Sequence, residues 1–268
     1  MTRRSFLASS VTASALAAGA SRSSGTMALE IDQTSAEYYE LRLYHLRRGR
    51  QHNLISEYLK AAWLPAMNRI GISPIGVFEV MAGPESPTIY TLIPYKSLEV
   101  FGGAYARISA DPEYQQRAAA VINAPASEPA YERTESSLMV AFDGMPQIQP
   151  PSFGERQAGR IFELRTYESH SRKANKKKIE MFNTEEIAIF RRNGLLPVFF
   201  GETLIGDKLP QLTYMLTFDS MESHDKNWAK FAADAEWKKL STTAGYTDAE
   251  IVSNISNMFL RPAPYSQI

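Results

Sequence analysis

The sequence predicts an α+β protein in which two ferredoxin-like repeats of one chain close a single α/β barrel. Two observations lead to this prediction. The strand sequence YELRLYH at residues 39–45 returns as FELRTYE at residues 162–168, and both copies continue as helix, strand, strand, helix and strand. Such self-similarity indicates a duplicated folding unit, and two sheets from one chain can pack their helix-free faces together.

The duplication keeps one register along the whole repeat. An offset of 123 residues carries Glu40 onto Glu163. The same offset relates Arg42 to Arg165, Tyr44 to Tyr167, Gly71 to Gly194, Pro74 to Pro197, and ADPEYQQ at 110–116 to ADAEWKK at 233–239. We therefore predict a first domain over residues 38–142, a Pro- and Gly-rich linker over 143–159 and a second domain over 160–262.

Periodicity and turn residues place the elements of the first copy. In order, they are a strand at 39–46, a helix at 52–70, strands at 75–81 and 88–95, a second helical stripe at 98–108, a short helix from Asp111 and a strand at 136–142. Gly71 is expected to end the first helix, and Pro65 to kink or split it. Asp111 followed by Pro112 has the residue types of a helix N-terminus.

The second copy repeats this order. Its elements are a strand at 161–168, a helix at 173–193 ended by Gly194, strands at 198–204 and 212–218, a helical stripe at 221–231 and a strand at 256–262. The basic run RKANKKK at 172–178 opens the first of these helices. We interpret it as a solvated face, the alternative being contact with an anionic surface or partner.

The N-terminus is typical of an export segment. Arg3 and Arg4 precede a short uncharged run at 11–20 that ends in small residues. The twin arginine followed by Ser-Phe-Leu resembles the twin-arginine type of signal, so residues 1–25 predict export to the bacterial periplasm. The alternative is a mitochondrial presequence, but no basic residue lies between Arg4 and Arg22 to form a basic amphipathic helix. No apolar run is long enough to span a bilayer.

Composition excludes several classes of function. The chain has no cysteine, which rules out disulfides, a thiolate nucleophile and cysteine-based metal sites. Its 29 basic and 29 acidic residues balance, so there is no electrostatic case for a nucleic-acid partner. The four histidines show no spacing typical of a helical metal site, and we predict no metal. No Ser-His-Asp arrangement or Gly-rich phosphate loop is present either.

The repeated ELRLY and ELRTY strands, with the matching downstream features, resemble the NIPSNAP family over both modules. That family belongs to the dimeric α/β barrel superfamily, so the resemblance implies a barrel whose interior can hold a ligand. Superfamily relatives include cofactor-free monooxygenases, muconolactone-type isomerases, haem-degrading enzymes and haem peroxidases. Because function depends on the site and not on the fold, the resemblance alone assigns no chemistry.

Alternation within the repeated strand separates two faces. Residues 39, 41 and 43 share the apolar face, which we expect to pack under the helices. The other face carries the candidate ligand-binding residues Glu40, Arg42 and Tyr44, with Glu163, Arg165 and Tyr167 in the second copy, and it is expected to line the barrel interior. Tyr90 and Tyr214 extend this set if their register holds.

Two interpretations of this set stay open. In one, the arginines offer fixed positive charge to an anionic or carbonyl-bearing ligand and the tyrosines donate protons. In the other, satisfied Glu–Arg pairs fill the barrel and the tyrosines are packing residues. His45 is interpreted as a strand-end residue and His224 as a hydrogen-bonded core or boundary residue. Haem would need an axial ligand such as histidine, and neither position has supporting context.

The sequence therefore gives two function classes. The first is an exported, cofactor-independent enzyme, monooxygenase- or isomerase-like, that acts on a small, partly apolar carbonyl or enolisable ligand. The second is a non-catalytic binding or interaction protein with a side-chain-filled barrel. The ligand, the pathway, the signal cleavage site and any higher oligomer are beyond sequence patterns.

Overall fold

Both repeats of the computed structural model have the predicted order of helices and strands, over the described residues 35–83, 86–152 and 159–268. The first repeat consists of β1 (Tyr38–His45), α1 (Arg50–Tyr58), the π-helical turn η1 (Leu59–Trp63), α2 (Leu64–Arg69), β2 (Gly76–Val80), β3 (Thr88–Tyr95), α3 (Leu98–Ser109), α4 (Pro112–Ile122) and β4 (Arg133–Ala141). The predicted export segment lies outside the described residues, as does part of the predicted linker.

The second repeat follows the same plan with one additional short helix, α9. It consists of β5 (Ile161–Glu168), α5 (Arg172–Met181), the π-helical turn η3 (Phe182–Glu186), α6 (Ile187–Arg192), β6 (Leu196–Ile205), β7 (Gln211–Phe218), α7 (Met221–Ala233), α8 (Ala235–Ser241), α9 (Asp248–Ile251) and β8 (Asn254–Pro262). Residues 34–268 form one compact unit.

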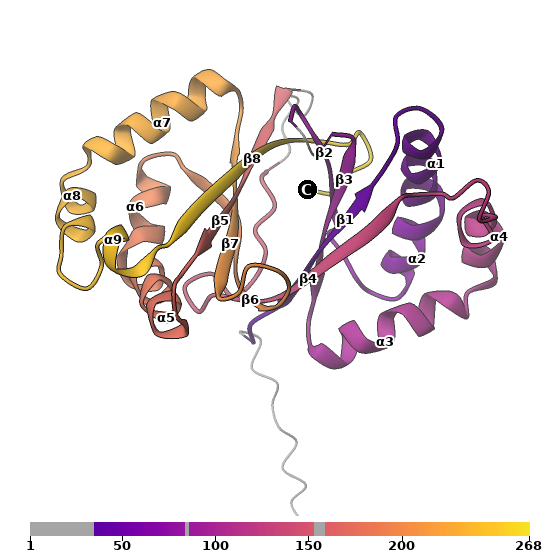
Figure 1. Ribbon diagram of the computed structural model, residues 1–268, viewed down its shortest axis with the longest axis horizontal. Coiled ribbons are helices and arrows are strands. Elements are labelled where there is room, and N and C mark those ends of the chain that lie inside the picture. Colours follow the sequence, from indigo (N-terminus) through magenta and orange to yellow (C-terminus); the bar gives the residue numbers. More distant parts are fainter. Residues whose placement is uncertain (1–34, 84–85, 153–158) are drawn as a thin grey trace, which may run out of the picture. The chain divides into compact units, whose positions relative to one another are not determined.

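The eight strands close into one barrel. Their order is β1-β3-β2-β8-β5-β7-β6-β4, so each repeat contributes a four-stranded antiparallel sheet. The two sheets are joined by antiparallel pairing of β2 with β8 and of β4 with β6. In Figure 1 the helices of the first repeat lie on one side of the strands and those of the second repeat on the other. The predicted fold class is confirmed.

Three apolar clusters correspond to the layers of this architecture. One fills part of the barrel interior and draws on both sheets, with Tyr39, Phe78, Phe162 and Phe199 among its members. The other two lie between each sheet and its own helices. β1 and β5, the strands that carry the repeated motif, are therefore covered on both of their faces, which is the feature that decides where the candidate site residues point.

Local sequence features behave as predicted at the helix ends. Gly71 and Gly194 follow the first helical segment of their repeats with φ of 84° and 81°, a left-handed conformation that glycine adopts without steric cost. Asp111 caps α4, because its Oδ1 accepts hydrogen bonds from the backbone N–H groups of Glu113 and Tyr114. Lys178, the last residue of the basic run, is buried, so the solvated-face interpretation is wrong at that position.

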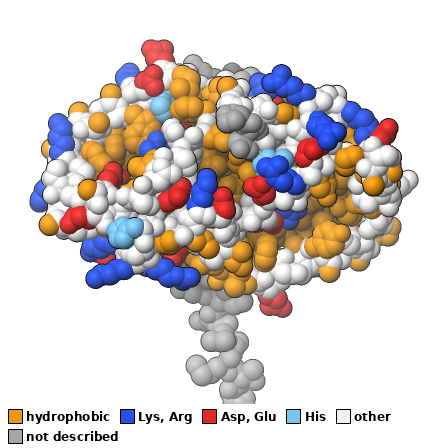
Figure 2. Space-filling model, viewed as in Figure 1, with side chains coloured by type: hydrophobic (Ala, Val, Ile, Leu, Met, Phe, Trp, Pro, Cys, Tyr) orange, Lys and Arg blue, Asp and Glu red, His pale blue; other side chains and the backbone are white. Residues whose placement is uncertain are grey.

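Most of the face in view has no patch of a single charge, although several basic side chains gather at its lower left edge (Figure 2). Elsewhere on this face, Figure 2 shows acidic and basic side chains interspersed. Within the part of the chain that the structure describes, no helix is both long and apolar enough to cross a membrane.

Candidate functional site

The Glu-Arg-Tyr strand motif faces the helices, and the prediction that it lines the barrel interior is wrong. The Arg42 guanidinium lies 5.7 Å from the centroid of the Trp63 ring in η1. Tyr44 and Tyr167 belong to the two helix-side clusters. The interior instead receives the odd-numbered residues of β1, such as Leu41. Because β1 and β5 are largely buried on both faces, their more polar side chains can find partners on the helix side, such as Trp63 for Arg42 and Trp228 for Glu163.

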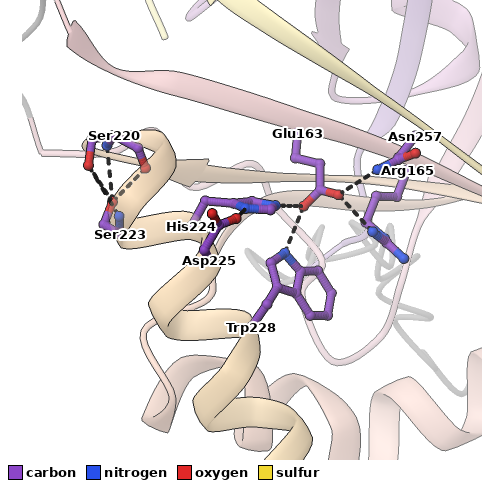
Figure 3. Close-up of polar contacts among 8 residues, drawn as sticks. All are labelled: Glu163, Arg165, Ser220, Ser223, His224, Asp225, Trp228 and Asn257. Atoms are coloured by element: carbon purple, nitrogen blue, oxygen red, sulfur yellow. Dashed lines mark hydrogen bonds and ion pairs between the residues drawn. The ribbon is translucent and has the colours of Figure 1, made fainter.

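Glu163 shows what the motif does in the second repeat. Its carboxylate is 1 % exposed and accepts hydrogen bonds from Arg165 Nη1 at 2.7 Å, Trp228 Nε1 at 2.9 Å and Asn257 Nδ2 at 3.1 Å. His224 Nε2 lies 3.3 Å from the same carboxylate. Figure 3 shows these donors converging from β5, β8 and α7. The carboxylate is therefore fully satisfied and fastens α7 to the sheet.

His224 has the structural role predicted for it. Its ring is packed edge-on against Phe218 and Phe259, and its Nδ1 lies 2.8 Å from Asp225 Oδ1. The start of α7 is fixed by a capping box in which Ser220 and Ser223 exchange hydrogen bonds (Figure 3).

Glu40 makes the corresponding arrangement in the first repeat. It accepts hydrogen bonds from Arg42 Nε at 2.8 Å and Tyr95 Oη at 2.8 Å, and a short one from the Ser136 hydroxyl. Burial raises the pKa of Tyr44 and opposes its ionisation. In the first repeat the carboxylate thus joins strands of one sheet, and the contact of Arg42 with the Trp63 ring is the link to the helices.

Tyr90 and Tyr214 lie on different faces. Tyr214 is on the helix side, where its hydroxyl donates to the Tyr167 hydroxyl at 3.1 Å and burial holds its pKa well above the usual value. Tyr90 belongs to the interior cluster. The repeat offset explains this difference, because the equivalent of Tyr90 is Thr213 and not Tyr214. A one-residue shift in a strand moves a side chain to the opposite face.

One end of the barrel interior contains a cavity of about 670 Å³. The first repeat contributes Leu41, Leu43, His45, Tyr90, Ser137 and Met139 to its wall. The second repeat contributes Leu164, Thr166, Gln211, Thr213, Ser256 and Met258. Of the predicted site residues, only Tyr90 lines this cavity, and neither Arg42 nor Arg165 does.

The opposite end of the barrel is filled by aromatic side chains. The ring centroids of Phe78 and Phe162 are 4.8 Å apart, and those of Tyr39 and Phe199 are 5.3 Å apart. All four residues are fully buried. This end is therefore filled by side chains, but by aromatic residues and not by the predicted Glu–Arg pairs, whereas the end that contains His45 is hollow.

His45 is the cavity residue best suited to chemistry. It is 8 % exposed, its Nε2 lies 3.1 Å from Glu135 Oε1, and its Nδ1 lies 3.5 Å from Thr88 Oγ1. Arg133 Nε donates to Glu135 at 2.8 Å, and this hydrogen bond is the main reason that the pKa of Glu135 is lowered. The result is an imidazole held against an ionised carboxylate at the edge of an apolar space.

The interpretation of His45 as a strand-end residue missed this site. The signal was in the sequence, because His45 shares the alternation of Leu41 and Leu43. This alternation would have placed His45 at the cavity only if the face with Leu41 and Leu43 had been predicted to line the barrel interior. Among the described residues, no group of three or more His, Asp or Glu side chains could hold a metal ion.

The fold and the cavity together define a dimeric α/β-barrel protein in which both ferredoxin-like units come from one chain. The NIPSNAP family profile matches residues 39–142 and again residues 162–267. The chain therefore belongs to the NIPSNAP family, and it contains two copies of the family's domain.

Two solved structures that cover most of this chain have the same fold, and a third is similar to part of it. A putative monooxygenase from Fusobacterium nucleatum subsp. nucleatum is similar over 85% of this chain and 93% of its own, with 9% identity and a TM-score of 0.57. A putative monooxygenase from Lactobacillus acidophilus is similar over 85% and 94%, with 10% identity and a TM-score of 0.54. A NIPSNAP-like domain protein from Burkholderia xenovorans is 23% identical over 40% of this chain and 89% of its own, with a TM-score of 0.37. No curated protein matches the chain.

Proposed function

We propose that this protein binds a small, partly apolar organic molecule in the barrel cavity and moves a proton on it without a cofactor. The observation that carries the proposal is His45, held by Glu135 in the wall of a cavity of about 670 Å³. Ligand sites commonly have volumes of about 300–1,000 Å³ and apolar walls with a few polar groups. The leucines and methionines of this wall, with its histidine and hydroxyl groups, match that description.

The chemistry assigned to His45 is general acid–base catalysis. Imidazole is the side chain best suited to exchanging protons near neutral pH. The Glu135 carboxylate, kept ionised by Arg133, would stabilise the imidazolium that forms when His45 takes a proton. Suitable substrates carry an acidic proton next to a carbonyl group or on an enol. Return of the proton to another atom is isomerisation, and reaction of the resulting anion with dioxygen is the monooxygenase alternative.

This assignment replaces the roles first given to the arginines and tyrosines of the strand motif. Those side chains lie on the helix side of the sheets, and none of them lines the cavity. A haem-dependent reaction has little support, because both ring nitrogens of His45 already have contacts with Glu135 and Thr88.

A His45→Gln variant tests the proposal, with Tyr44→Phe as its matched control. Tyr44 is the adjacent residue, but it faces the helices. Molecules that co-purify with the full chain would be identified by native mass spectrometry, and their conversion followed by chromatography. We expect His45→Gln to lower turnover about 100- to 10,000-fold, with binding changed only a few-fold, and Tyr44→Phe to leave turnover unchanged.

Three outcomes would change the conclusion. Unchanged turnover in His45→Gln would remove His45 from the chemistry. Binding without any conversion would favour the second function class, a non-catalytic binding protein that uses the same cavity. A Soret band in the purified protein would contradict the cofactor-free proposal.

We further propose that residues 1–25 direct export through the twin-arginine route. Arg3 and Arg4 before the uncharged run support this proposal. Replacing both arginines by lysine should retain the folded protein in the cytoplasm of a bacterial host, as measured by cell fractionation. Export that is unaffected by this change would contradict the proposed route.

A further inference from the structure

We infer that the ligand lies in the cavity in one fixed orientation, with its apolar body against Leu43 and the Tyr90 ring of the first repeat and an uncharged polar edge against the second repeat. This inference rests on the proposed function, since it assumes that the cavity binds a ligand. It comes from comparing the two walls at equivalent positions, which a duplicated unit makes possible.

Interior-facing residues that are paired across neighbouring strands form rows around the cavity. The deeper row is apolar in both repeats and contains Leu41 in the first and Leu164 in the second. The next row toward the opening differs between the repeats. In the next row of the first repeat, Leu43 is paired with Tyr90 on β3. The equivalent residues of the second repeat are Thr166 on β5 and Thr213 on β7, which are also paired. An apolar wall made of Leu43 and the Tyr90 ring thus faces a wall of hydroxyl groups, and on its other side Leu43 is paired with Glu135 of β4, the partner of His45.

The hydroxyl row extends over three neighbouring strands. Thr166 is paired with Thr213 on one side and with Ser256 of β8 on the other. The Thr166 and Thr213 hydroxyl oxygens are 3.1 Å apart and share one hydrogen bond. Each hydroxyl has one donor and two acceptor positions, so this single bond leaves hydrogen-bonding capacity on both. The row can therefore donate to a ligand and accept from it.

The chemistry of this row selects a class of ligand. Its side chains are neutral, so it suits hydroxyl, carbonyl or amide groups better than a carboxylate or a phosphate. The charged residues of the lining, Arg133, Glu135, Asp207 and Lys208, include both signs. We therefore expect an amphipathic molecule with an apolar, ring-like body and at least two uncharged oxygen or nitrogen groups along one edge.

The asymmetry also bears on His45. A barrel with two equal walls would hold a ligand equally well in two orientations related by the repeat. The repeat equivalent of His45 is Glu168, which does not line the cavity. One orientation brings the same atom of every bound molecule to His45. Thr166 and Thr213 would thus act as specificity-determining residues and not as catalytic ones.

Biphenyl and dihydroxybiphenyl form a matched pair of probes for the full-length protein. The double variant Thr166→Val with Thr213→Val removes both hydroxyl groups while keeping the side-chain shape, and it leaves neither partner unpaired. The control is Thr217→Val on β7, whose hydroxyl donates to the Ile161 carbonyl and which does not line the cavity. Dissociation constants would be measured by calorimetry.

We expect the double variant to bind dihydroxybiphenyl about 10- to 100-fold more weakly than the wild type and biphenyl within about 3-fold of it. The control should bind both probes as the wild type does. Retained affinity for biphenyl would also show that the variant is folded and its cavity intact.

Equal losses for the two probes in the double variant, or no loss for either, would overturn the fixed orientation while leaving ligand binding in place. Failure of the wild type to bind either probe would instead overturn the proposed function, and the inference with it. The reverse change provides a second measurement. Leu43→Thr should weaken binding of biphenyl more than binding of dihydroxybiphenyl, and the opposite order would contradict the assignment of the apolar wall.

Discussion

The two repeats solve the same packing problem with different chemistry beneath their first helices. In the first repeat the buried pair is Ile55 and Trp63, which is apolar. The equivalent residues of the second repeat are Lys178 and Glu186, also buried, with Nζ and Oε2 3.1 Å apart. The comparison shows that the fold requires side chains of suitable volume at these two positions. It does not require one kind of interaction.

The π-helical turn is common to both repeats and does not depend on proline. Residues 59–63 and 182–186 form it at equivalent positions. Pro65 follows it in the first repeat, as expected of a residue that breaks a helix, but Ala188 occupies the equivalent position in the second. Each turn ends at the position where the two repeats differ in chemistry, which is Trp63 in the first and Glu186 in the second. We infer that packing against the sheet sets the turn and that proline is merely compatible with it.

The arginine of the strand motif keeps an aromatic partner in each repeat, although the partner comes from a different helix. Arg42 lies over Trp63. In the second repeat Glu186 occupies the equivalent of that tryptophan position, and Arg165 lies 4.7 Å from the centroid of Trp228 on α7. The contact between a guanidinium group and an indole ring is thus retained while its source in the sequence changes.

The largest predicted effect breaks the polar pair of the second repeat. Lys178→Met removes the only lysine that contacts Glu186 among the described residues and leaves a buried carboxylate whose pKa is already raised by burial. We expect the free energy of unfolding to fall by about 3–5 kcal/mol, measured by urea denaturation. Ile55→Met, the matched change in the apolar pair, should cost less than about 1.5 kcal/mol.

A double variant sharpens the same comparison. Lys178→Met combined with Glu186→Leu gives the second repeat an apolar pair like that of the first. Replacing a buried ion pair by apolar residues of similar volume is often neutral or stabilising. We therefore expect the double variant to recover most of the loss. A double variant as unstable as Lys178→Met alone would show that the second repeat does require the ion pair.

A smaller effect, dependent on pH, contrasts Asp111 with its repeat equivalent Asp234. Both cap a helix and bind an arginine, Arg69 or Arg192. The hydrogen bond from that arginine is the main reason that the pKa of each aspartate is lowered, and the lowering is larger at Asp234. Arg192 reaches both carboxylate oxygens of Asp234, and Asn193 donates a further hydrogen bond.

The sign of the pH effect follows from those lowered pKa values. A carboxylate with a folded pKa below its unfolded value of about 3.9 stabilises the fold above that pH, and the contribution is lost as the pH falls through the folded value. Asn is as good an N-cap as Asp, so Asp→Asn removes the charge and keeps the cap. Below about pH 5 the stability of the wild type should fall as the pH falls. We expect Asp234→Asn to reduce this dependence on pH more than Asp111→Asn does, as measured by urea midpoints. Identical curves for both variants would contradict the contrast.

The sequence by itself determined the duplication, the order of elements and the helix ends. These depend on local information, namely the repeat offset, the spacing of apolar residues, the left-handed glycines Gly71 and Gly194 and the Asp111 cap. The alternation of β1 also separated two sets of side chains correctly. None of these signals requires knowledge of what packs against the strand.

Only the tertiary structure decided which set of side chains faces the cavity. β1 and β5 are buried on both faces, so alternation distinguishes the faces without saying which lies inside. The polar set of Glu40 and Arg42 has its hydrogen-bonding partners within its own sheet and its aromatic contact, Trp63, on the helix side, and the set containing Leu43 and His45 lines the cavity. Lys178 is buried for the same reason, because its partner Glu186 is brought to it by the turn of the helix and not by any pattern in the basic run.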